Sequence, residues 1–449
     1  MITIKKKYVH FNILFFLIFI AVFLSSMNGA QLFGISLNKI GLIPLEIYVI
    51  YHILINGKIS VNKNLYPLLI FYLVQVIGSL FGLMKVSYND TYSGYNERLI
   101  NNIIQNILIY LPIVTGIGLI KDKYPIFDYL KKSIIYVARF QCVWAIIQFF
   151  LWYAVSFDLN TYIFVEVLKG ILGDSLGVSL INIGGTQLRA SGLTGPAQFS
   201  VLMLLSICVD KKILFKILYL FGSVLAMSRV GMVTNLLILV VQVLYNFYWQ
   251  KNYKRVILFY KIFFGLILLT AVFVILYNNV TLVKEQIDNS VGRFFGMKED
   301  TGSERHLMYP VYAVYSWLID LNIFEKIWGV GARVSGLTFT HSEYVSSHIT
   351  LNNEMLTTAW EIECDVGAIL LGDGIVGFFA YLYILFRLIK TKNIEFISLG
   401  LGLFVYGFMY VTFSNTIIQI TLIIVLTTIE DKKSISYNSY LKSLENKSV

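Results

Sequence analysis

The sequence predicts an all-α polytopic membrane protein with about twelve transmembrane helices and one large extracytoplasmic loop before the last three of them. Of its 449 residues, 57% are hydrophobic and only 14% are charged, whereas a soluble domain is about 25% charged. Apolar runs that approach the roughly 20 residues needed to cross a bilayer core recur along the chain. Lys and Arg concentrate in alternate connections between these runs, which is the positive-inside pattern.

The predicted spans follow from the apolar runs, and together they form a single membrane domain, residues 1–449. The runs are Phe11–Met27, Ile35–Ile55, Tyr66–Met84, Leu99–Ile120, Ser133–Val155, Ser191–Val209, Ile213–Met227, Val230–Trp249, Val256–Asn278, Val366–Ile389, Ile394–Val411 and Thr416–Ile429. The first follows a short basic segment, as a signal peptide does. Because many spans come after it, we expect an uncleaved first span.

The basic connections set the predicted orientation. They contain Lys5–Lys7, Lys58/Lys63, Lys121/Lys123/Lys131/Lys132, Lys211/Lys212, Lys251/Lys254/Arg255, Arg387/Lys390/Lys392 and Lys432/Lys433. All fall on one side, which we expect to be cytoplasmic, with both termini on that side. The net charge of +10 arises mostly from these short connections, so nucleic acid is not an expected partner.

The longest polar segment, Thr281–Asp365, is the predicted extracytoplasmic loop and the expected place of an active site. It holds twelve of the 26 acidic residues and three of the five histidines. Within it, Ser303 is a predicted N-cap for a helix that reaches Ile319. A second helix is predicted over Leu351–Asp365, running into the tenth span. On that helix Glu361 and Asp365 would share a face and Glu363 would point elsewhere.

Three arginines at the predicted outer surface are candidates for binding a lipid pyrophosphate. They are Arg189, Arg229 and Arg305. The planar guanidinium offers phosphate oxygens two parallel donors, and the helix N-terminus near Arg305 adds backbone donors. The alternative interpretation is that each is an interfacial anchor whose side chain extends to the membrane surface.

Carboxylates near the end of the loop are candidates for a general base. Asp365, Glu363 and Glu361 lie where the loop enters the membrane, and a base must reach the hydroxyl that it deprotonates. The alternative is a solvated loop face. His306 and His348 are possible alternative bases, because histidine titrates near neutrality.

No cofactor or metal is predicted. The sequence has no HExxH motif and no Cys/His spacing typical of a metal site. The three cysteines imply no disulfide framework. The predicted cytoplasmic connections are too short for a nucleotide-sugar domain, so an activated cytosolic donor is not expected.

Several segments together resemble the Wzy polymerases of bacterial surface polysaccharides. The chain shares the twelve-span layout with a large outer loop. The motifs are Arg189–Pro196, Ser228-Arg229, Ile327–Gly331, Glu361–Asp365 and the following Gly374–Phe378. O-antigen ligases have the same layout, but they typically carry a His-Asn pair in the loop, and here His348 is followed by Ile349.

The resemblance implies a membrane glycosyltransferase in the bacterial cytoplasmic (inner) membrane. Its substrate would be an oligosaccharide repeat unit on undecaprenyl diphosphate, and its product an O-antigen or capsular polysaccharide. The lipid pyrophosphate would be the leaving group, and a chain-length regulator and a flippase would be partners. The alternatives are an O-antigen ligase and a flippase or other transporter of the same lipid-linked sugars. The outer loop and the absence of an internal repeat argue against a transporter.

Overall fold

The computed structural model describes most of the chain. The described residues are 2–27, 30–32, 35–85, 91–121, 123–172, 176–178, 183–184, 187–226, 228–249, 260, 277–278, 284, 288, 301–349 and 353–429. They are mostly helical, as the sequence predicts. The ninth predicted span, Val256–Asn278, and the first twenty residues of the predicted loop lie almost entirely outside the described residues.

Five helical stretches among the described residues are long and apolar enough to cross a bilayer. They are α2 (Leu37–Ile40) with α3 (Ile43–Asn56), η1 (Lys63–Leu65) with α4 (Tyr66–Leu83), α6 (Tyr95–Ile104) with the π-helical η2 (Gln105–Tyr110) and α7 (Leu111–Lys121), α8 (Ile126–Val155), and α13 (Arg229–Trp249). This supports a membrane protein. The total of twelve spans stays a prediction.

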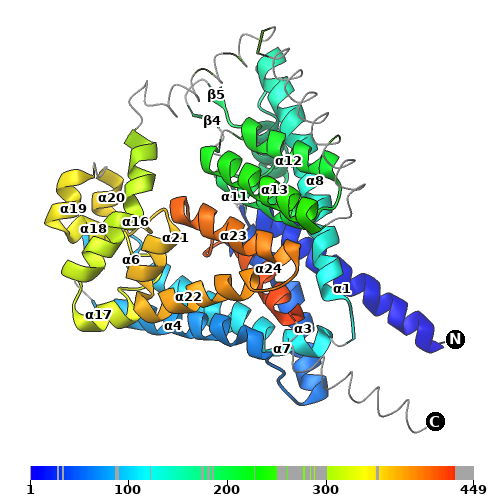
Figure 1. Cartoon of the computed structure of the whole chain (residues 1–449), viewed down its shortest axis with the longest axis horizontal. Helices are drawn as coiled ribbons and strands as arrows, with labels where there is room; N and C mark the ends of the chain where they lie inside the picture. Colours follow the sequence, from blue (N-terminus) through cyan, green and yellow to red (C-terminus); the bar gives the residue numbers. More distant parts are fainter. Residues whose placement is uncertain are drawn as a thin grey trace.

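Other apolar helices occupy the remaining predicted spans within the described residues. They are α1 (Ile2–Ser26), α11 (Pro196–Val209), α12 (Ile213–Leu225), α21 (Asp365–Gly372) with α22 (Gly374–Ile389), α23 (Ile394–Met409) and α24 (Thr416–Thr428). Helix α24 lies centrally (Figure 1) and is buried nearly all round. Because neighbouring helices surround most of it, apolar residues occur on all of its faces.

Among the described residues, short strands depart from the all-α fold that the sequence predicts. A three-stranded antiparallel sheet has the order β2–β1–β3, formed by β1 (Ala30–Leu32), β2 (Ile35–Ser36) and β3 (Leu176–Val178). A hairpin joins β4 (Ile183–Gly184) to β5 (Gln187–Leu188). Three short helices come before β3 in the chain. They are α9 (Leu159–Thr161), η3 (Tyr162–Leu168) and α10 (Lys169–Leu172). The pairing of β1 with β3 joins the connection after the first predicted span to the connection before the sixth. Both connections lie on the predicted extracytoplasmic side.

The long polar segment forms a folded lobe with a core of its own. Its helices are α16 (Thr301–Ile319), α17 (Ile323–Trp328), α18 (Leu337–His341), α19 (Glu343–His348) and α20 (Asn353–Thr357), which lie at the left of Figure 1. Tyr309, Phe339, Trp360 and Ile362 are buried within it. The predicted helix that reaches Ile319 is confirmed as α16, and Pro310 lies inside it. The predicted N-cap is wrong, because the helix already begins at Thr301 and Ser303 lies within it.

The second predicted loop helix, Leu351–Asp365, is wrong. Helix α20 ends at Thr357, and a new helix, α21, begins only at Asp365. Between them Trp360 accepts a backbone hydrogen bond from Gly336, and the Ile362 amide donates to Ser335 Oγ at 3.2 Å. These bonds to another segment replace the local bonds of a helix. Glu361 and Asp365 therefore share no helix face.

A hydrogen bond and an ion pair connect helix ends that are far apart in sequence. The basic connections place these ends on the same side of the membrane. At the basic side, Asn62 Nδ2 donates to Thr427 O at 3.0 Å, and Lys131 pairs with Glu395 at 3.3 Å. The ends of α4, α22, α23 and α24 remote from these contacts face the lobe (Figure 1). The lobe therefore lies against helix ends of one predicted side.

Candidate functional site

A tight backbone contact builds the base of the site. Residues Ile327–Gly331 lie along the junction of α21 and α22, where the Val330 amide donates to Leu371 O at 2.9 Å and the Gly331 amide donates to Gly372 O at 3.1 Å. Gly374 has a φ of +67°, and a Cβ there would lie 2.3 Å from Ile327 O. Only glycine allows this approach. The motifs Ile327–Gly331 and Gly374–Phe378 thus meet in one backbone contact.

Arg333 extends from the turn that follows this contact. The turn is closed by the Val334 amide donating to Gly331 O at 3.4 Å. Arg333 has a φ of +70°, a left-handed conformation that costs a non-glycine residue roughly 1–2 kcal/mol. A side chain retained at such a position is typical of a functional constraint.

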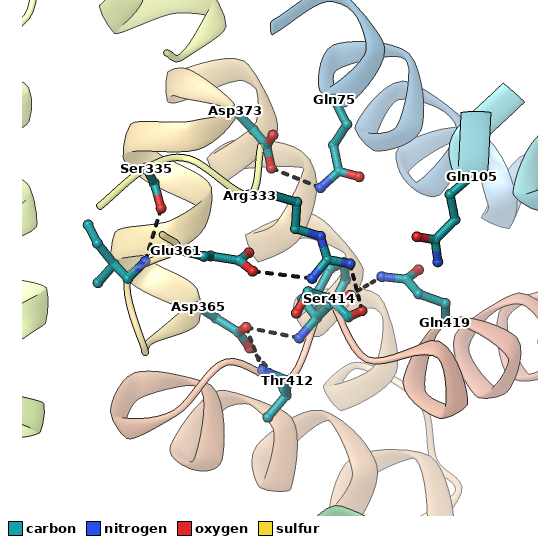
Figure 2. Close-up of polar contacts among 12 residues, drawn as sticks. Gln75, Gln105, Arg333, Ser335, Glu361, Asp365, Asp373, Thr412, Ser414 and Gln419 are labelled. Carbon is teal, nitrogen blue, oxygen red and sulfur yellow. Dashed lines mark hydrogen bonds and ion pairs between the residues drawn. The ribbon is translucent and has the colours of Figure 1, made fainter. Parts of the chain in front are cut away.

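The guanidinium of Arg333 joins two segments that are distant in sequence. Nη1 donates to Glu361 Oε2 at 3.2 Å, and Nη2 donates to Ser414 O at 3.0 Å (Figure 2). Burial lowers the pKa of Arg333, but the charge and hydrogen bond of Glu361, together with Tyr110 and Asp373, outweigh burial and raise the pKa, so the side chain stays cationic. The side chains of Arg333 and Glu361 are 28% and 20% exposed. Solvent therefore reaches this ion pair.

Asp365 lies beside this pair but is fully buried, with an exposed fraction of 0%. Its Oδ1 accepts from the backbone amides of Thr412 and Phe413 at 2.7 and 2.9 Å, and its Oδ2 accepts from Thr412 Oγ1 (Figure 2). Both carboxylate oxygens are therefore engaged. This carboxylate fixes the connection between α23 and α24.

The Glu361–Cys364 segment alternates between exposed and buried side chains. Ile362 and Cys364 are buried, while Glu361 is half-buried and Glu363 is exposed. This period of two is that of an extended chain. Cys364 Sγ accepts the Gly367 amide at 3.3 Å as the N-cap of α21, and burial raises the pKa of its thiol to about 12. Cys364 is therefore a structural thiol, and the adjacent Glu363 faces solvent.

Asp373 is a site residue that the sequence analysis did not select. It occupies the break between α21 and α22, is buried, and its Oδ2 accepts from Gln75 Nε2 at 3.2 Å (Figure 2). Its Oδ1 has no hydrogen-bond partner among the described residues. An Asp between two glycines in an apolar run is a signal that could have found it, because charge in a membrane segment is usually functional.

The predicted arginines lie in three different segments of the chain. Arg189 is exposed just after β5, and Arg229 is half-buried at the start of α13. Arg189 and Glu363 both lie within electrostatic range of Tyr410. The backbone of Arg305 lies in the first turns of α16, but its side chain lies outside the described part of the structure. Arg189 and Glu363 are thus brought to a common neighbour.

Of the two predicted histidines, the structure describes the side chain of His348. His348 is exposed, its ring lies 4.3 Å from that of Tyr344, and its Nδ1 lies 2.8 Å from Tyr344 O. His306 is in α16, and its side chain is not described. Within the described residues, no group of three His, Cys, Asp or Glu side chains is arranged to hold a metal ion.

The arrangement offers an exposed carboxylate, Glu363, on a segment fixed by the Arg333–Glu361 pair and by buried Asp365. Such a carboxylate can accept a proton from a bound hydroxyl, and the exposed cation of Arg189 can bind an anionic group. No protein-family model matches the chain, and no curated protein matches its sequence.

Proposed function

We propose that the chain is a membrane glycosyltransferase that polymerises oligosaccharide repeat units carried on undecaprenyl diphosphate. The reaction takes place at the outer face of the cytoplasmic membrane, and the product is an O-antigen or capsular polysaccharide. The growing chain on one lipid is transferred to the non-reducing end of a unit on another. The lipid diphosphate leaves, and no nucleotide or metal cofactor is needed.

One observation carries the assignment of the base. Among the three candidate carboxylates, Asp365 is fully buried, Glu361 is half-buried, and Glu363 is exposed. A base must reach the acceptor hydroxyl, so we assign this role to Glu363. Glu363 and Arg189 both interact electrostatically with Tyr410, which supports a site in which the base and a phosphate-binding cation act on one substrate pair.

The bond changes define what each side chain supplies. The acceptor hydroxyl oxygen attacks the anomeric carbon of the donor, and its proton passes to Glu363. The bond from that carbon to the diphosphate oxygen breaks on the opposite side, so the configuration inverts. Negative charge grows on the departing diphosphate, and cations placed there stabilise the transition state. Arg189, Arg229 and Arg305 are assigned this role.

The ion pair and the buried carboxylate act as positioning groups. Arg333 ties the Glu361 segment to the carbonyl of Ser414, and Asp365 ties the start of α21 to Thr412. Both contacts hold the extended segment that carries Glu363 against the α23–α24 connection. Such restraint preserves the short distances that proton transfer requires.

The membrane position of the site fits a lipid-linked donor. The site lies where α21, α22 and α23 meet the folded lobe (Figure 1), at ends that carry few Lys or Arg residues. The positive-inside pattern predicts such ends to be extracytoplasmic. A diphosphate at the outer leaflet would lie at this depth.

The surface polysaccharide of a deletion strain tests the proposal. We expect single repeat units to reach the lipid core while longer polymer is lost. Polymer that remains on the carrier lipid but never reaches the core would instead indicate a ligase. Lipid-linked units accumulating at the inner leaflet would indicate a flippase, and either result would overturn the proposal.

A further inference from the structure

A cavity lies between the folded lobe and the ends of α4 and α6, and its lining includes none of Glu361, Glu363 and Asp365. Its volume is about 210 Å³. Its walls come from the end of α4, the start of α6, the end of α16, and from α17 and α18. Val334 lines it, whereas Arg333, the preceding residue, extends to Glu361. The turn that positions the ion pair therefore also forms a wall of this cavity.

The cavity combines apolar walls with a few charged groups. The apolar surface is provided by Leu321, Val330, Val334 and Leu337. Lys85 lines it and is ion-paired with Glu325. Asp320 is exposed at the cavity, and its carboxylate forms no hydrogen bond or ion pair with any side chain in the described part of the chain. The accessible lining is somewhat more polar than apolar, and such a mixed pocket suits a ligand with both hydroxyl groups and C–H faces.

The charge of the cavity selects among ligands. Burial, and then the charge of Lys85, lower the pKa of His341, so this histidine is neutral at neutral pH. The pair of Lys85 with Glu325 is neutral as a unit, and Asp320 adds one negative charge. The interior therefore disfavours phosphates and acidic sugars. It favours groups that donate hydrogen bonds to a carboxylate, as hydroxyls do.

We propose that this cavity binds one neutral sugar residue of the polysaccharide substrate, with Asp320 accepting hydrogen bonds from its hydroxyls. The proposal rests on the proposed function and adds a binding site for its substrate. The apolar wall packs on the C–H face of the sugar ring. The volume is below the roughly 300–1,000 Å³ of a pocket for a drug-sized ligand, so the cavity holds one ring and the rest of the saccharide extends beyond it.

The cavity lies close enough to the catalytic segment for a bound sugar to orient the reacting part of the substrate. Because the Gly331–Val334 turn separates the cavity from the Arg333–Glu361 pair, a sugar held there lies beside the catalytic segment without occupying it. Binding energy from a remote sugar can then orient the reacting one. Loss of this site should weaken the binding of long substrates without removing the base.

Ligand-observed NMR on the full chain in detergent tests this site directly. The probes are the methyl glycosides of glucose, galactose, rhamnose and N-acetylglucosamine, with methyl glucuronide as the acidic counterpart. We expect at least one neutral glycoside to bind saturably and the glucuronide to bind at least tenfold more weakly. Asp320→Asn should weaken the neutral glycoside at least tenfold, and Leu321→Phe, which fills the cavity, should abolish its binding. Glu343→Gln, an exposed lobe carboxylate away from the cavity, should bind as the unaltered protein does.

The proposal is overturned if no neutral glycoside binds, if the glucuronide binds as well as the neutral glycosides, or if both cavity variants bind normally. The outcome is separable from that of the proposed function. Glu363→Gln should bind the glycoside normally while it fails to polymerise. If the unaltered protein binds the glycoside but does not polymerise repeat units, the sugar-binding proposal stands and the proposed polymerase function is overturned.

Discussion

Substitutions of Asp365 test whether this buried carboxylate stabilises the fold or acts as the catalytic base. The carboxylate receives three hydrogen bonds, from two backbone amides and the hydroxyl of Thr412. In Asp365→Asn the amide oxygen can retain both backbone donors, and its NH₂ group can donate to the Thr412 hydroxyl. The hydrogen bonds persist but lose their charge, which lowers each contribution by roughly 1 kcal/mol. We therefore expect a loss of stability of about 3 kcal/mol.

Asp365→Ala removes the acceptor altogether. Two buried amides, those of Thr412 and Phe413, are then left without it, at roughly 1–3 kcal/mol each. With the loss of the hydroxyl contact, we expect a cost of about 4 kcal/mol or more, which is large for a single substitution. Much of the Asp365→Ala protein should fail to accumulate in the membrane.

Thermal unfolding of the detergent-purified variants measures these differences, and polymerisation is assayed on the folded fraction. Asp365→Asn should unfold at a lower temperature and yet polymerise at a rate within about tenfold of the unaltered protein. Glu343→Gln serves as the control for an exposed carboxylate. The reasoning is refuted if Asp365→Asn unfolds as the unaltered protein does and is inactive, because that result makes Asp365 the base.

Three further predictions concern the backbone, the cations and the topology. Gly374→Ala should lower the free energy of unfolding by about 3 kcal/mol or more, because its Cβ would meet Ile327 O. The control Gly57→Ala, at a φ of +60° with nothing within 4 Å, should lower it by only about 1 kcal/mol. Equal losses of stability in thermal unfolding would contradict the tight contact at Gly374. Arg189→Lys should keep the charge but lower the polymerisation rate roughly tenfold or more; normal polymer length on analysis of the product would remove Arg189 from the site. Reporter fusions after Lys123 should read cytoplasmic and one after residue 326 should read extracytoplasmic, and an inside signal at 326 would overturn the orientation.

Local patterns predicted the parts of the fold that depend on local sequence. Apolar runs located the helices, and the spacing after Ser303 located α16, because a helix with one apolar face repeats every 3.6 residues. The carboxylates at the end of the loop were also found. Their arrangement was not, because a helix was assumed up to Asp365. The alternation of Glu361, Ile362, Glu363 and Cys364 is itself a period of two and indicates an extended segment.

The contacts that organise the site could not be predicted from local patterns. Arg333 meets Glu361 across 28 residues and Ser414 across 81, and no periodicity reports such pairs. Its left-handed backbone is set by the turn that docks on α21, which is a tertiary contact. Asp373 is different, since a carboxylate in an apolar run is visible in the sequence, although its bond to Gln75 is not.

Polymerisation by Glu363→Gln in reconstituted vesicles tests the central claim most directly. The vesicles contain the purified chain and undecaprenyl-diphosphate-linked repeat units, and polymer length and released lipid diphosphate are measured. A general base contributes roughly 10²–10⁴-fold to a rate. The account predicts that Glu363→Gln, folded and thermally stable, is slowed about 100-fold or more, while Glu343→Gln polymerises normally. Normal polymer length and diphosphate release by Glu363→Gln would contradict the account.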